Sequence, residues 1–95
     1  MTVIQVKVKF FSFENGGRPC LPEGSGYSPH FVVQGSSDYL GVRFLDTPKE
    51  LFAEQAYIQK VQLIYEPDID YKPLSKGKLF SVLEGGKTVA VGEVL

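Results

Sequence analysis

The stretch that decides the fold is residues 78–95, which read KLFSVLEGGKTVAVGEVL. Two segments rich in Val, Leu and Phe flank the pair Gly85-Gly86. Glycine accepts the positive φ angles that a two-residue hairpin turn requires. The sequence therefore predicts an antiparallel hairpin with strands over 78–84 and 87–95.

Alternating apolar and polar residues predict further strands upstream. Residues 4–10 read IQVKVKF, which places four apolar side chains on one face and Gln5, Lys7 and Lys9 on the other. Two more strands are expected over 30–34 and 39–45, paired as a hairpin across the turn-forming residues between them. A fourth upstream strand begins at Tyr57 and is expected to continue until Pro67, which cannot donate a ladder hydrogen bond.

The segment Thr47-Pro48-Lys49-Glu50 has the composition of a helix start. It places an N-cap residue before a proline, with glutamate three positions after the cap, and it predicts one or two helical turns. About six strands with at most one short helix indicate a single all-β domain over residues 1–95. Its architecture is either an antiparallel sandwich or a small closed barrel.

Composition excludes several classes of protein. A chain of 95 residues, 43% hydrophobic, with 10 basic and 11 acidic side chains, forms one small domain and has no overall charge that attracts nucleic acid or membrane. The apolar runs are shorter than a membrane span, and no signal-peptide pattern opens the sequence. The lone Cys20 cannot form an intrachain disulfide, so we expect a reducing, cytoplasmic location.

No motif for catalysis or cofactor binding is present. Cys20 and His30 are the sole thiol and imidazole, and no third residue is placed to orient them. Asp68 and Asp70 are too few for a calcium loop. The glycines of residues 24–29 do not join a strand to a helix as a dinucleotide site requires, and no phosphate-binding lysine loop occurs. We expect a protein that is not an enzyme and that binds no metal, cofactor or nucleotide.

The long loop over residues 14–29 contains four glycines and three prolines, and loops of this length often carry function. One interpretation is a strip for RNA, with basic side chains on the exposed strand face and aromatic rings for stacking. The residues available for such a strip are Lys7, Lys9, Arg18, Arg43, Tyr27 and Phe31.

Four motifs follow one another along the chain. They are GGRPCLPEGSGYSPHFVV at 16–33, SSDYLGVRFLD at 36–46, VQLIYEPDI at 61–69 and EGGKTVAVGEVL at 84–95. In order and spacing they resemble the third domain of bacterial elongation factor Tu. The resemblance implies a closed, six-stranded antiparallel β-barrel. The GTP-binding domain and second barrel of that factor have no counterpart in these residues, so the resemblance implies no GTPase activity.

The family's third domain contacts the T-arm of aminoacyl-tRNA, its own nucleotide domain and the exchange factor. The resemblance places Arg18 and Gly85 at tRNA-facing positions. Glu66 stands where the family has a basic or imidazole residue, and its charge would repel a phosphate. We therefore expect a stand-alone protein-binding module whose partner is either a translation factor or a nucleotide domain of the kind that such a barrel normally covers.

The predicted contact surface combines the long loop with the last hairpin turn. Its residues are Arg18, Tyr27, His30, Phe31, Glu84, Gly85, Gly86 and Lys87. Two alternatives stay open. One is a weak tRNA- or RNA-binding module that uses Arg18, Lys87 and the backbone of Gly85. The other is a decoy or immunity-type mimic of the elongation factor.

Overall fold

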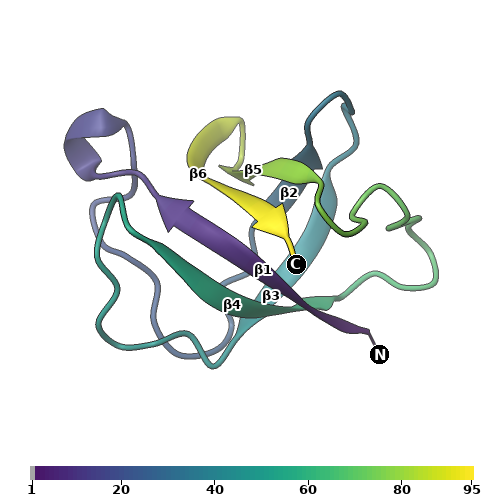
Figure 1. The fold of residues 1–95 in the computed structure, drawn as a ribbon, viewed down its shortest axis with the longest axis horizontal. Coiled ribbons are helices and arrows are strands. Elements are labelled where there is room, and N and C mark those ends of the chain that lie inside the picture. Colours follow the sequence, from purple (N-terminus) through teal and green to yellow (C-terminus); the bar gives the residue numbers. More distant parts are fainter. Residues whose placement is uncertain (1) are drawn as a thin grey trace.

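Six antiparallel strands close into a barrel in the computed structural model, which describes residues 2–95 (Figure 1). The strands are β1 (Val3–Phe10), β2 (His30–Val33), β3 (Leu40–Leu45), β4 (Ala56–Leu63), β5 (Leu79–Glu84) and β6 (Lys87–Val94). Around the ring their order is β1-β4-β3-β2-β5-β6. The all-β class, the six-stranded closed barrel and both predicted hairpins are confirmed.

Strand β1 shows how the sequence pattern produces the barrel. Val6, Val8 and Phe10 are buried inside, whereas Lys7 is exposed outside. The strand pairs with β4 along one edge and with β6 along the other. Because the ring closes in this way, the six strands leave no unpaired edge.

Aromatic rings fill the centre of the barrel. Phe31 stacks on Phe80 with their ring centroids 4.0 Å apart, and Phe44 meets Phe31 edge-on at 6.3 Å. Gly92 is opposite Phe80 in the β5–β6 ladder. A Cβ at Gly92 would lie 2.5 Å from the Phe80 ring and 2.5 Å from the Lys7 carbonyl oxygen, so only glycine fits there.

Strand β4 ends earlier than its sequence predicts. It ends at Leu63, and a turn begins before Pro67 is reached, so the prediction that this proline ends the strand is wrong. The turn lets the Tyr65 ring lie directly over Gly41, where a side chain would collide with it. The Tyr71 hydroxyl then donates to the Gly41 carbonyl (2.5 Å) and accepts from the Tyr65 amide (3.1 Å). These contacts fix the loop after β4 against β3.

The helix predicted at residues 47–50 is absent, and that prediction is wrong. Thr47 instead forms an isolated bridge with Gly24, with hydrogen bonds of 2.8 and 3.1 Å in the two directions. Its buried hydroxyl has no hydrogen-bond partner within residues 2–95, so it caps no helix. The helical content of this range is one 3-10 turn, η1 (Phe13–Asn15). No helix in the same range is long and apolar enough to cross a membrane.

Candidate functional site

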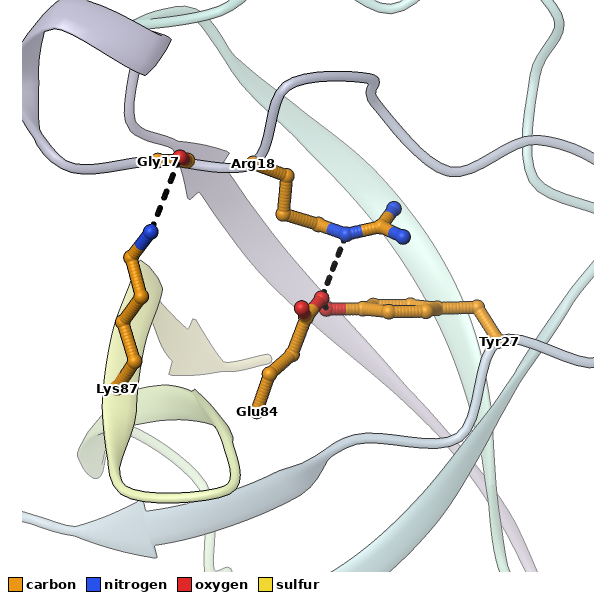
Figure 2. Close-up of polar contacts among 5 residues, drawn as sticks. All are labelled: Gly17, Arg18, Tyr27, Glu84 and Lys87. Atoms are coloured by element: carbon orange, nitrogen blue, oxygen red, sulfur yellow. Dashed lines mark hydrogen bonds and ion pairs between the residues drawn. The ribbon is translucent and has the colours of Figure 1, made fainter.

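Two glycines fix the start of the long loop. Gly16 adopts a left-handed φ of +91° and ends η1. Gly17 is buried, and a Cβ there would lie 2.0 Å from the Phe11 carbonyl oxygen. The chain therefore leaves η1 along one path, which brings Arg18 over the turn between β5 and β6 (Figure 2).

Arg18, Tyr27 and Glu84 form one polar cluster (Figure 2). The Arg18 Nε lies 2.6 Å from the Glu84 Oε2. The Tyr27 hydroxyl donates to the same carboxylate oxygen. The Arg18 guanidinium carbon lies 4.7 Å from the centroid of the Tyr27 ring, in cation–π geometry. Each member therefore contacts the other two.

The cluster is half-buried, and this controls its protonation. Burial raises the pKa of the Tyr27 phenol far above its ordinary value, and the hydrogen bond and negative charge of Glu84 raise it further. The phenol is therefore neutral and donates its proton to the carboxylate. The positive charge of Arg18 is balanced by Glu84. This arrangement ties the long loop to strand β5.

The hairpin turn adds a second connection to the same loop. Gly85 has a φ of +62°, the left-handed conformation that the turn requires, and Glu84 pairs with Lys87 across it. The Lys87 Nζ donates to the Gly17 carbonyl oxygen over 3.4 Å. Gly86 completes the turn and has open space around its Cα. The structure thus brings together Arg18, Tyr27 and the residues of the turn, as predicted.

His30 and Phe31 do not join this cluster. Phe31 is fully buried in the barrel, so the prediction that it contacts a partner is wrong. Phe31 is the first inward-facing residue of β2, and its ring must face inward to stack on Phe80. His30 faces outward, half-buried, and meets the exposed Tyr39 ring edge-on at 5.7 Å.

The site does not assemble a recognisable catalytic group. Cys20 is a free, exposed thiol. Within residues 2–95, no three His, Cys, Asp or Glu side chains gather in a way that holds a metal ion. The Arg18–Glu84–Tyr27 cluster consists of side chains that contact one another. Its geometry therefore suits positioning of loops.

Another contact joins η1 to the segment before β4. The Glu54 Oε2 accepts hydrogen bonds from the Ser12 amide (2.8 Å) and the Asn15 side-chain amide (3.0 Å). The Glu54 amide donates to the Phe10 carbonyl (2.7 Å). These two acceptor bonds lower the pKa of the Glu54 carboxyl, and the charge of Lys9 lowers it further. Glu54 itself holds a left-handed φ of +65°, which is uncommon for a residue with a side chain.

Glu54 fixes two segments that carry exposed aromatic side chains. Phe13 is 65% exposed and Phe52 is 63% exposed, the two highest values for a large apolar side chain in the described part of the chain. Neither residue could be identified from the sequence, because Phe52 follows a helix-cap pattern and nothing local distinguishes Phe13 from a core residue. We call η1, residues 52–54 and the turn 84–87 the loop end of the barrel.

No protein-family model matches the chain, and no curated protein matches it. The resemblance to the third domain of elongation factor Tu therefore stays a prediction beside the observed barrel.

Proposed function

We propose that this protein is a non-enzymatic binding module that docks a partner protein at its loop end. The exposure of Phe13 and Phe52 carries the proposal. Aromatic side chains are enriched at protein interfaces, where a few of them supply most of the binding energy. Two such rings on connected loops are suited to anchor a partner.

The loop end is also fixed before a partner arrives. Glu54 ties residues 52–54 to η1, and the Arg18–Glu84–Tyr27 cluster ties the following loop to β5. Loops held in one conformation lose less conformational entropy on binding. These polar contacts therefore support docking without touching the partner.

Charge and burial favour a protein over RNA at this surface. Arg18 is balanced by Glu84, and the fully buried Phe31 cannot stack on a base. The exposed Glu14 and Glu54 add negative charge at the loop end. With Glu84 balanced by Arg18, these two carboxylates outweigh the positive charge of Lys87, and the balance disfavours a phosphate backbone there.

The resemblance to elongation factor Tu supports a partner from the translation machinery. In that family the third barrel packs against a GTP-binding domain, so a domain of that kind is the first partner to test. The free, exposed Cys20 supports action in the reducing cytoplasm.

The test compares variants of the exposed rings. The purified chain and its Phe13→Ser/Phe52→Ser variant are immobilised, and binding of host proteins and of the purified elongation factor Tu GTP-binding domain is measured. The control is Tyr39→Ser, which removes an aromatic ring that is 50% exposed on another surface. We expect one specific partner that binds the wild type and the control and is lost from the double variant. Equal retention by all three proteins, or no partner, would contradict the proposal.

A further inference from the structure

A groove of about 500 Å³ lies on the outer wall of the barrel, over β1, β6 and β5. The ladders place its residues in two rows, because outward-facing residues alternate along each strand. In one row Lys7 pairs with Glu93, which pairs with Leu79. In the other, Lys9 pairs with Val91, which pairs with Ser81. The two rows form neighbouring parts of one surface.

The hollow follows from side-chain size. Val91 and Ser81 in the second row are short, and Ala56 continues that row on β4 opposite Lys9. Gly92 lies between the rows and contributes only backbone to the lining. Leu79, which is 52% exposed, forms part of the first row and leaves apolar surface in contact with water.

The lysines give this apolar groove a charged wall. Lys7 and Lys9 lie two residues apart on one face of β1, so their Cα atoms are separated by roughly 7 Å. Within residues 2–95 the one ion pair joins Arg18 to Glu84. Neither lysine ammonium group therefore has a carboxylate within ion-pair distance in that range. Glu93 is the one carboxylate in the lining. The groove therefore combines an apolar floor with an excess of positive charge.

We propose that this groove binds a small amphipathic carboxylate, with the apolar chain on the floor and the carboxylate between Lys7 and Lys9. The volume lies in the range of small-molecule sites, roughly 300–1,000 Å³. An extended peptide is a poorer occupant, because the closed barrel offers no free strand edge for main-chain pairing. The inference does not depend on docking at the loop end.

The test titrates the isotope-labelled chain with decanoate below its micelle concentration and follows methyl resonances by NMR. We expect saturable shifts at Leu79 and Val91, and unchanged resonances at Ile69, which lines a separate groove beside Asp68 and Asp70. From hexanoate to decanoate, each methylene should tighten binding about two- to fourfold, the range from half to full burial. The matched cation decyltrimethylammonium should bind at least about threefold more weakly.

Charge variants identify the site. Lys7→Gln/Lys9→Gln should weaken decanoate binding about three- to tenfold, as expected for two exposed ion pairs. Lys60→Gln/Lys76→Gln removes the same charge from exposed positions outside the groove and should change affinity less than about twofold. Equal affinity for the anionic and cationic probes, equal weakening by both variants, or shifts at Ile69 as large as those at Val91 would overturn the proposal. Absence of saturable binding would also overturn it.

Discussion

Gly92→Ala is a direct test of the packing that closes the barrel. The new Cβ would lie 2.5 Å from the Lys7 carbonyl oxygen and 2.5 Å from the Phe80 ring, whereas ordinary contacts begin at 3.4 Å. The carbonyl belongs to the β1 backbone and cannot move without disturbing the ladder with β6. Overpacking of this kind costs about 1–3 kcal/mol, and the lower backbone entropy of alanine in the unfolded chain returns about 0.5–1 kcal/mol. Because one of the two clashes is with backbone, the cost lies at the upper end of that range, and we expect a net loss of about 2 kcal/mol.

The measurement is urea unfolding, with Gly86→Ala as the matched control. Gly86 has no atom near its Cβ position and no left-handed φ, so alanine there should be neutral or slightly stabilising. A loss of about 2 kcal/mol in Gly92→Ala corresponds to a Tm lower by about 8–16 °C in a domain of this size. If Gly92→Ala were as stable as Gly86→Ala, the Phe80 ring would not lie beneath β6 and the packing described for this strand would be refuted.

Two further predictions concern the contacts that hold the loops. Tyr27→Phe removes the hydrogen bond to the Glu84 carboxylate and keeps the ring beneath Arg18. The free energy of unfolding, measured with urea, should therefore be about 1–2 kcal/mol lower than in the wild type. An unchanged urea midpoint would contradict a stabilising role for this hydrogen bond. Glu54 has a lowered pKa in the folded state, so its stabilising contribution is full above the ordinary glutamate pKa and is lost as the pH falls through the folded value. Glu54→Gln should therefore flatten the stability profile between neutral and acidic pH, and an identical profile for both proteins would exclude this role.

The strands could be predicted because their signals are local. Alternation in β1 and the Gly85-Gly86 turn each act within a few residues, and both appear as expected. The capping pattern at residues 47–50 failed because it competes with a distant partner. Thr47 forms an isolated antiparallel bridge with Gly24, which lies more than twenty residues upstream. Local helix signals are weak against tertiary hydrogen bonds of this kind.

Gln59 is a buried polar residue, and the period-2 alternation of β4 already indicates that it faces inward. Gln59 alternates with Tyr57, Val61 and Leu63 on the inner face of β4 and is only 2% exposed. Its amide donates to the carbonyls of Leu45 and Lys60, each over 2.8 Å. Its Oε1 accepts from the Tyr57 hydroxyl over 2.8 Å. Period-2 alternation already placed Gln59 inside, but only the structure supplies the partners that make its burial tolerable.

The candidate site was predictable in part for the same reason. Arg18 and the residues of the hairpin turn belong to motifs in which glycines fix the backbone, so their neighbourhood follows from the fold. Phe13 and Phe52 could not be identified, because a loop phenylalanine becomes a core or a surface residue according to contacts made far along the chain. In this protein Glu54 fixes both segments, because its carboxylate accepts hydrogen bonds from Ser12 and Asn15.

Closure of the barrel limits how any ligand can bind. Since the six strands satisfy one another's backbone groups, recognition must use loops or outward-facing side chains. The loop end offers exposed rings on fixed loops, and the outer wall offers an apolar groove beside two lysines that form no ion pair within residues 2–95. The two surfaces share none of the residues that carry either proposal. Phe13→Ser/Phe52→Ser should therefore leave decanoate affinity unchanged, and Lys7→Gln, which keeps the charge of Lys9 near Glu54, should leave partner capture unchanged. If either variant altered the other readout, one surface would serve both ligands, and the division between loop end and wall would be wrong.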